Sequence, residues 1–268
     1  MFKGFGVTQW EAPYQGEELL AWAKKIGLKT VSIEFDSKAC TDDPSTEEWA
    51  IGWRKNLEKY GLEPSILAIN VLCDIGMSRP ERETDCMYSI SLALKAARAM
   101  GAPAVHMPSF FDGWIYNREQ LDQTIKCLKY ACGLGERYGV KIGHEAVLPD
   151  EYYDIVLEEL KEYEGTLYML FDNENMSSRG IDPVPVYKKY APKYIHAHLK
   201  HGRDGVPYPI VQDVRFGGVR NVLKAMDEQG FRGWIIFESS YKSARTPQEA
   251  EAILREDMAF VESVLKPE

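Results

Sequence analysis

Three carboxylates and one imidazole recur at regular intervals in the second half of the sequence. Glu145, Asp172, His198 and Glu238 each stand at or near the end of a short apolar run, about one strand and one helix apart. If the fold brings them together, their like charges would push protons back onto the carboxylates unless a cation neutralises them. Oxygen ligands with one nitrogen favour Mn²⁺, Mg²⁺ or Co²⁺, and Zn²⁺ is also compatible. The pattern therefore predicts a site for one divalent metal ion.

Each of these residues also has a simpler interpretation. Taken alone, any one of them is commonly a hydrogen-bonded residue at a strand end or half of an ion pair. His196 shares its strand face with His198, because side chains alternate along a strand, and the pattern does not separate the two. By the same alternation His144 is expected to be a structural neighbour of Glu145. Four suitable ligands at four consecutive strand ends favour the metal.

The elements that must position these residues are eight short apolar runs, each followed by an amphipathic stretch. The runs predict strands at residues 4–10, 30–35, 65–70, 104–108, 140–145, 166–172, 194–200 and 233–239. The stretches predict helices at residues 16–27, 45–61, 80–100, 117–138, 150–163, 183–190, 218–229 and 247–265. Alternating strands and helices imply a parallel sheet.

Eight such units in roughly 250 residues are the size of a (β/α)8 TIM barrel, so we expect one domain over residues 1–268. A doubly wound open sheet is the alternative, but it would usually carry a glycine-rich turn after an early strand, and GFG at residues 4–6 is no such motif. In a barrel the carboxyl ends of the strands form one rim. Side chains far apart in the sequence would therefore converge there.

Composition narrows the classes of function. The chain has 268 residues and a net charge of −9, which counts against a nucleic-acid partner. No apolar run approaches the ~20 residues needed to span a bilayer, and the first residues lack the apolar core of a signal peptide. The five cysteines form no CxxC pair, so we expect free thiols in a reducing compartment and a cytoplasmic protein.

Four motifs carry a resemblance to a known family: HE at 144–145, FDNEN at 171–175, HAHLK at 196–200 and FES at 237–239. With these motifs and its eight units, the sequence resembles the xylose isomerase-like barrel superfamily, in its sugar phosphate isomerase/epimerase branch. The resemblance implies that Glu145, Asp172, His198 and Glu238 hold Mn²⁺ or a similar ion. It also implies that the two glutamates act as an acid/base pair and that the protein is a homo-oligomer, either a dimer or a tetramer.

Further substrate contacts are expected around this set. Ketose 3-epimerases of this type bind substrate through a glutamate six residues after the first ligand, where this chain has Glu151; an acid in the first turn of a helix is the equal alternative. Those enzymes carry a histidine where this chain has Asn175. They also carry an arginine about six residues after the histidine ligand, and Arg203 follows His198 after five.

Other candidates follow from position alone. His106 ends the fourth predicted strand, and Trp114 lies in the aromatic loop 107–117, which is either a wall over the substrate or a packing element. Trp10 has the same two interpretations. Lys200 could orient a phosphate, a carboxylate or an enediolate oxygen, and Arg215 could meet a phosphate near a helix N-terminus.

These observations predict a metal-dependent sugar isomerase or epimerase that works through an enediolate. The alternative enzyme is a lyase that uses the same site on a keto-inositol or on a 3-keto sugar or glycoside. A barrel that only binds a sugar is a third class, which metal content would distinguish. An endonuclease of the same superfamily is disfavoured, because Asn70 and Arg215 stand where its zinc-binding histidines are expected.

Overall fold

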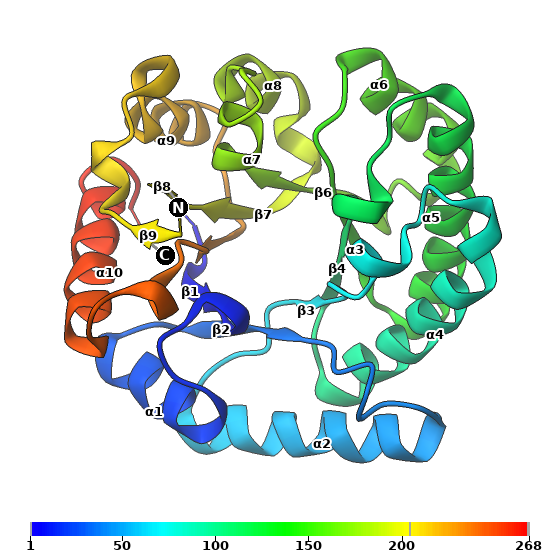
Figure 1. Ribbon diagram of the computed structural model, residues 1–268, viewed down its shortest axis with the longest axis horizontal. Helices are drawn as coiled ribbons and strands as arrows, with labels where there is room; N and C mark the ends of the chain where they lie inside the picture. The colour runs from blue at the N-terminus through cyan, green and yellow to red at the C-terminus, as the bar shows by residue number, and fades with distance from the viewer. Residues whose placement is uncertain (1, 204, 267–268) are drawn as a thin grey trace. The chain divides into compact units, whose positions relative to one another are not determined.

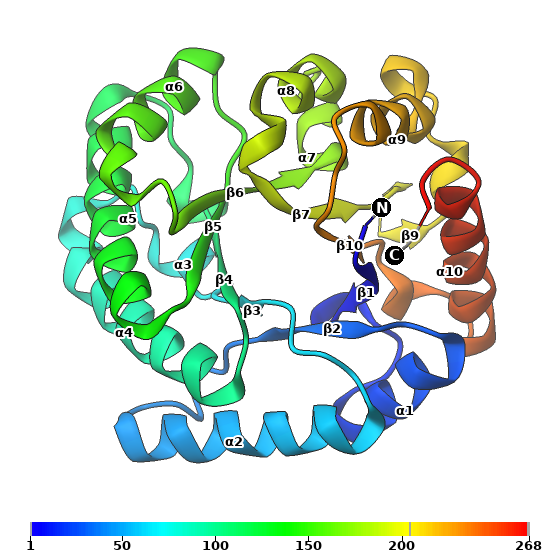
Figure 2. The same cartoon turned by 180° about the vertical axis from the view of Figure 1, so that it is seen from behind.

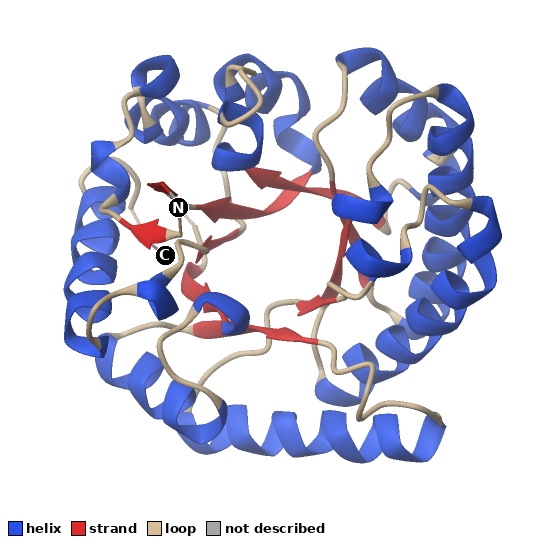
Figure 3. Cartoon of the chain, viewed as in Figure 1, coloured by secondary structure: helices blue, strands red, loops and turns tan. Residues whose placement is uncertain are grey.

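The computed structural model describes residues 2–203 and 205–266, with the side chains of residues 202 and 203 left out. Eight strands form a closed barrel in the order β1-β10-β7-β6-β5-β4-β3-β2, which confirms the predicted (β/α)8 TIM barrel (Figure 3). The barrel strands are β1 (Gly4–Thr8), β2 (Thr30–Glu34), β3 (Leu67–Ala68), β4 (Ala104–Pro108), β5 (Lys141–Glu145), β6 (Leu167–Asp172), β7 (Tyr194–Leu199) and β10 (Trp234–Phe237).

Each predicted helix is present, with ends within a few residues of those expected. The long helices are α1 (Gly16–Ile26), α2 (Asp43–Tyr60), α4 (Glu83–Met100), α5 (Arg118–Tyr138), α6 (Asp150–Glu159), α8 (Pro183–Tyr190), α9 (Val219–Glu228) and α10 (Pro247–Glu262). The sequence did not predict the short helices α3 (Leu72–Ile75) and α7 (Asn173–Ser177), nor the antiparallel pair β8 (Gly202–Arg203) and β9 (Val206–Pro207).

Packing contacts group the residues into two compact units. The first unit is Met1–Ser32, Leu57–Glu63 and Phe171–Glu268, and the second is Ile33–Asn56 and Pro64–Leu170. The single domain expected over residues 1–268 stays a prediction.

In the first unit, register places the ends of three strands side by side. β1 pairs in parallel with β10, with Val7 opposite Phe237, and β10 pairs in parallel with β7, with Ile236 opposite His198. Gly6 allows β1 to approach β10 closely, because a Cβ there would lie 2.7 Å from Ile236 Cδ1. Helices α8 and α9 pack against each other and lie side by side in Figure 2.

In the second unit, β4 and β5 form the best-paired ladder. Their register runs from Ala104 opposite Lys141 to Pro108 opposite Glu145. Helices α4 and α5 pack against each other beside these strands (Figure 1). The Asn117 side chain caps α5 by accepting a hydrogen bond from the Gln120 backbone N–H. This ladder places Glu145 at the carboxyl end of its strand.

Strands β1, β4 and β10 are buried along their whole length, as is typical of parallel strands covered on both faces. The five cysteines, Cys40, Cys73, Cys86, Cys127 and Cys132, are free thiols, as expected from their spacing. Within the described part of the chain, no helix is long and apolar enough to cross a bilayer.

Candidate metal and acid/base site

Three of the predicted ligands meet in the first unit. Asp172 is the last residue of β6, His198 is the next-to-last residue of β7, and Glu238 directly follows β10. His198 Nδ1 lies 3.2 Å from Glu238 Oε2 and 3.9 Å from Asp172 Oδ2. The side chains of all three are buried or nearly so. Register and strand length thus bring one imidazole nitrogen and two carboxylate oxygens to one point.

Lys200 joins this group as a cation. Its Nζ lies 2.8 Å from Asp172 Oδ2 and 2.7 Å from Glu238 Oε2, and its side chain is 18% exposed. Lys200 was expected to contact a substrate oxygen. In the structure its ammonium bridges the two carboxylates, so a contact with substrate stays a prediction.

The other oxygen of each carboxylate is held by a donor that the fold fixes in place. Asp172 caps helix α7, and its Oδ1 accepts a hydrogen bond of 2.7 Å from the Asn175 backbone N–H. Glu238 Oε1 accepts a hydrogen bond of 2.9 Å from the Trp10 indole Nε1. Both carboxylates are therefore oriented before any ligand arrives.

Glu238 is kept ionised in spite of its surroundings. Burial alone would raise its pKa, but the charges of Lys200 and His198 and their hydrogen bonds hold the pKa of Glu238 well below its usual range. An ionised, buried carboxylate at neutral pH is suited either to bind a cation or to accept a proton.

Glu145 stands in the second unit at the end of β5. Its Oε2 lies 2.6 Å from His106 Nε2, and both side chains are almost fully buried. The neighbouring His144 forms a hydrogen bond of 2.9 Å with Ser109 Oγ. Burial lowers the pKa of His144 to about 4, so this ring is neutral at physiological pH. His144 is thus a structural neighbour, as alternation along the strand predicted.

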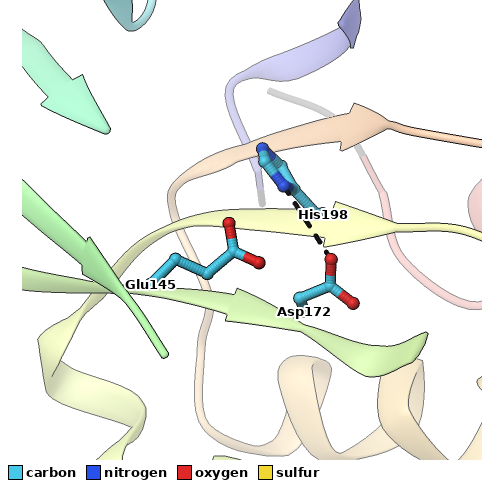
Figure 4. Close-up of side chains that lie close together, drawn as sticks. All are labelled: Glu145, Asp172 and His198. Carbon is cyan, nitrogen blue, oxygen red and sulfur yellow. Dashed lines mark ion pairs between the residues drawn. The ribbon is translucent and has the colours of Figure 1, made fainter. Parts of the chain in front are cut away.

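In the first unit, Asp172 Oδ2, His198 Nδ1 and Glu238 Oε2 are the ligand atoms that the strand ends bring together. Figure 4 labels Asp172 and His198 and draws the ion pair between them as a dashed line. Two carboxylate oxygens and one imidazole nitrogen in a buried place form a donor set that suits a divalent cation. The residues present therefore fit the predicted metal.

The remaining substrate candidates lie in three different settings. Glu151 is exposed in the first turn of α6, where an acid also suits the positive end of the helix dipole. Trp114 is partly buried, with its ring 5.0 Å from that of Phe110 in an edge-on contact. Arg203 lies in β8, and its side chain is outside the described residues. Their roles toward a substrate stay predictions.

Arg215 was expected to meet a phosphate near a helix N-terminus; in the structure it contacts two acids, and the contact with a phosphate stays a prediction. It donates hydrogen bonds to both Glu174 oxygens and to Asp213, and these bonds raise the pKa of Arg215 above its usual value. Glu174, Asp213 and His201 form a second group with metal-ligand types. Because the guanidinium already neutralises the two carboxylates, the group is an ion-pair network in this arrangement.

The sequence did not predict the roles of two residues beside the site. Trp10 was considered only as a wall or a packing residue, whereas its indole orients Glu238. Asn173 was not considered; its Oδ1 accepts from the Lys200 backbone N–H at 3.0 Å, and its Nδ2 donates to the Lys200 carbonyl at 3.1 Å. The one signal for Asn173 was its position directly after the predicted ligand Asp172.

A closed parallel barrel with acidic and histidine side chains gathered at the carboxyl ends of its strands defines a class of barrel proteins. Residues 20–264 match the family described as Xylose isomerase-like TIM barrel, and the chain belongs to this family. The resemblance inferred from the four sequence motifs is thereby confirmed.

Three relatives are named as an epimerase, an isomerase and a dehydratase. The chain is 26% identical over 227 residues to 2-epi-5-epi-valiolone 7-phosphate 2-epimerase from Actinoplanes sp., covering 82% of this chain and 81% of that protein. It is 32% identical over 142 residues to 2-oxo-tetronate isomerase from Haemophilus influenzae, covering 53% and 44%. Over 98 residues it is 28% identical to inosose dehydratase from Clostridium beijerinckii, covering 30% and 33%.

Solved structures support the same fold. An L-ribulose 3-epimerase superposes with a TM-score of 0.75 at 15% identity, covering 99% of this chain and 95% of that one. The IolI protein, crystallised with a bound zinc atom, gives a TM-score of 0.73 at 14% identity, covering 98% and 99%. At these identities the likeness shows the fold alone.

Proposed function

We propose that this protein is a divalent-metal-dependent sugar isomerase or epimerase that works through an enediolate. The observation that carries the proposal is the meeting of ligand atoms from Asp172, His198 and Glu238 in the first unit, where His198 Nδ1 lies 3.9 Å from Asp172 Oδ2 and 3.2 Å from Glu238 Oε2. Glu145, the last residue of β5, is the proposed fourth donor. The family and the epimerase and isomerase among its relatives support the reaction class.

Glu145, Asp172, His198 and Glu238 are the proposed ligands of one ion. Three oxygen donors and one nitrogen favour Mn²⁺, with Mg²⁺, Co²⁺ and Zn²⁺ as alternatives, and the zinc bound by the IolI protein is in keeping with such a set. When bound, the ion would polarise a substrate carbonyl and its neighbouring hydroxyl, and so acidify the C–H beside them.

Glu145 and Glu238 are the proposed acid/base pair. One carboxylate takes the proton from carbon and leaves an enediolate. If the other returns a proton to the opposite face of that carbon, the result is epimerisation. If the first returns it to the adjacent carbon, the result is isomerisation. Each positioned proton transfer contributes ~10²–10⁴ to the rate, and the lowered pKa of Glu238 supplies the ionised form that a base requires.

Other side chains are proposed to hold the substrate. His106, 2.6 Å from Glu145, and Lys200, which contacts Glu238, are the donors nearest to the acid/base pair. The other proposed substrate contacts are Glu151, Trp114, Arg203 and Arg215. The phosphate in the name of the Actinoplanes epimerase supports a phosphate group as the partner of the cationic members of this set.

A lyase that uses the same site is the second candidate. The similarity to inosose dehydratase favours it, as does Asn175, which replaces the histidine of ketose 3-epimerases. The first step would be the same proton abstraction beside a carbonyl. Loss of the β-hydroxyl, protonated by the second glutamate as it leaves as water, would then replace reprotonation at carbon.

One experiment tests both candidates. Metal-loaded protein is incubated in D₂O with a panel of ketoses, keto-inositols and 3-keto glycosides. Deuterium entering at carbon reports enolisation, and its position distinguishes epimerisation from isomerisation. Loss of water with a new conjugated carbonyl indicates the lyase. Absence of exchange with every member of the panel by fully metal-loaded protein would refute the proposed chemistry.

The proposal also covers the partners, the location and the oligomeric state of the protein. We expect a small-molecule substrate and no nucleic acid or membrane partner, in keeping with the net charge of −9. Five free thiols suit a cytoplasmic location. The family resemblance supports a homo-oligomer, either a dimer or a tetramer. Light scattering coupled to size-exclusion chromatography would separate these two states from a monomer.

A further inference from the structure

We propose that the Lys200 ammonium competes with the divalent ion for Asp172 Oδ2 and Glu238 Oε2, and thereby sets the affinity of the site for metal. The inference rests on the proposed metal site and adds a role for a residue outside the four ligands. Lys200 Nζ lies 2.8 Å from Asp172 Oδ2 and 2.7 Å from Glu238 Oε2. His198 Nδ1 is directed at the same two oxygens.

The competition takes place at Asp172 Oδ2 and Glu238 Oε2, because the other oxygen of each carboxylate has a fixed partner. Asp172 Oδ1 accepts from a backbone N–H at the start of α7, and Glu238 Oε1 accepts from the Trp10 indole. Neither donor can move without a shift of the chain or of a large ring. Lys200 holds its oxygens through a flexible four-carbon side chain, so it is the partner that can give way.

The main chain of Lys200 is held in place, whereas its flexible side chain can move. Its backbone N–H donates to Asn173 Oδ1 at 3.0 Å, and its carbonyl accepts from Asn173 Nδ2 at 3.1 Å. The main chain therefore stays in place when the ammonium moves. The side chain is 18% exposed, which provides a route for the ammonium away from the carboxylates.

Two cations on the same pair of oxygens would lie within a few ångströms of each other. Their repulsion in a partly buried site is strong, so the ion and the ammonium cannot contact the two oxygens at the same time. Binding of the ion would therefore release the ammonium of Lys200. The released ammonium can then donate to an oxygen of the substrate, which links metal loading to substrate contact.

The test is the affinity for Mn²⁺, measured by isothermal titration calorimetry at fixed pH and ionic strength. Lys200→Met keeps the apolar stem and removes the charge, so we expect Mn²⁺ to bind at least ~10-fold more tightly than to the wild type. Lys200→Arg keeps a cation at the two carboxylates and should bind Mn²⁺ no more tightly than the wild type. Unchanged or weaker binding by Lys200→Met would overturn the inference.

Lys242→Met is the matched control in the same unit. Lys242 Nζ donates to the Trp10 carbonyl at 2.8 Å, and its ion pair, at 3.2 Å, is with Glu11. Its removal should leave the Mn²⁺ affinity unchanged. An equal gain in affinity for Lys242→Met would reduce the effect to a general loss of positive charge and would also overturn the inference.

A second variant covers the case in which Lys200→Met fails to fold. Lys200→Gln retains a polar group but no charge, and it should also bind Mn²⁺ more tightly than the wild type. Circular dichroism before each titration establishes that the variant is folded. If the wild type binds none of Mn²⁺, Mg²⁺, Co²⁺ and Zn²⁺, the proposed function fails. If the wild type binds Mn²⁺ and neither uncharged variant binds it more tightly, only the competition fails.

Discussion

The indole of Trp10 donates a hydrogen bond of 2.9 Å to Glu238 Oε1, although the two residues stand at opposite ends of the sequence. Parallel pairing of β1 with β10 brings them together, because Val7 lies opposite Phe237 and the two chains leave the sheet at the same end. Lys200 contacts the other oxygen, Oε2, through a flexible side chain, so the indole is the fixed partner of the Glu238 carboxylate. Trp10 is therefore a positioning residue for the proposed acid/base group.

Trp10→Phe removes the donor and keeps most of the ring. A hydrogen bond to a charged group is worth roughly 1.5–3 kcal/mol, so we expect the rate of deuterium exchange into substrate to fall about 10- to 100-fold. The change should appear mainly in kcat, since the reacting carboxylate is misoriented. Steady-state exchange measured by NMR checks this.

Trp22→Phe is the control for this variant. Among the described residues, the buried indole N–H of Trp22 has no hydrogen-bond partner, so its loss removes no contact of this kind. Exchange by Trp22→Phe should match that of the wild type. If Trp10→Phe also exchanged at the wild-type rate, the positioning role of Trp10 would be wrong.

Replacement of either proposed acid/base residue should stop proton transfer without unfolding the protein. Glu145→Gln and Glu238→Gln keep the shape of the side chain and remove its basicity, so exchange should fall by at least ~10². Deuterium incorporation followed by mass spectrometry, with circular dichroism as a check of folding, measures both effects. Glu11→Gln changes an acid that pairs with Lys242 and should exchange normally. Normal exchange by both active-site variants would remove the acid/base assignment.

Binding of the proposed metal should raise thermal stability. At a free Mn²⁺ concentration of 100 times its Kd, the folded state gains about 2.7 kcal/mol, which for a chain of this size corresponds to roughly 5–10 °C in Tm. EDTA should reverse the shift, and Asp172→Asn should abolish it. The exposed Asp227 on α9 supplies a control, since Asp227→Asn should keep the full shift. A similar shift in Asp172→Asn would place the bound ion elsewhere.

Asp257 gives the stability a dependence on pH that is separate from the site. It accepts hydrogen bonds from the Ile210 backbone N–H at 2.7 Å and from the Tyr241 hydroxyl at 2.8 Å. Burial raises the pKa of Asp257 to about 7. The folded state thus retains a proton that the unfolded chain releases near pH 4. The contribution of Asp257 to the free energy of unfolding is complete below about pH 4 and is lost as the pH rises to about 7.

Asp257→Asn should remove this dependence. Relative to the wild type, its free energy of unfolding should increase by on the order of 2 kcal/mol between pH 5 and pH 8. Urea denaturation at the two pH values measures the difference, and Asp227→Asn should show no such relative change. A difference between Asp257→Asn and the wild type that stays constant across this range would contradict the raised pKa.

The barrel could be predicted because its signals are local. Apolar runs and amphipathic stretches alternate eight times, and each run became a strand of the barrel. The third strand is shorter than expected, with bounds of Leu67–Ala68, although Ile69 N still donates to the His106 carbonyl and continues the ladder. The β8–β9 pair was missed because two strands of two residues each carry no periodic pattern.

The site was predicted in its residue types more than in its contacts. Asp172, His198 and Glu238 could be found because the fold itself brings strand ends together. The partners of Lys200 and Arg215 depend on side-chain conformations and on loops, and no spacing in the sequence encodes them. The contact of Arg215 with Glu174, 41 residues away, could therefore not be predicted, and its proposed contact with a phosphate stays a prediction.

Anomalous diffraction from a Mn²⁺-soaked crystal at the manganese edge tests the central claim most directly. The account predicts one strong peak per chain, with a ligand atom from each of Glu145, Asp172, His198 and Glu238 within about 2.0–2.4 Å. A peak bound by other residues, or no peak in this place at a saturating Mn²⁺ concentration, would contradict it.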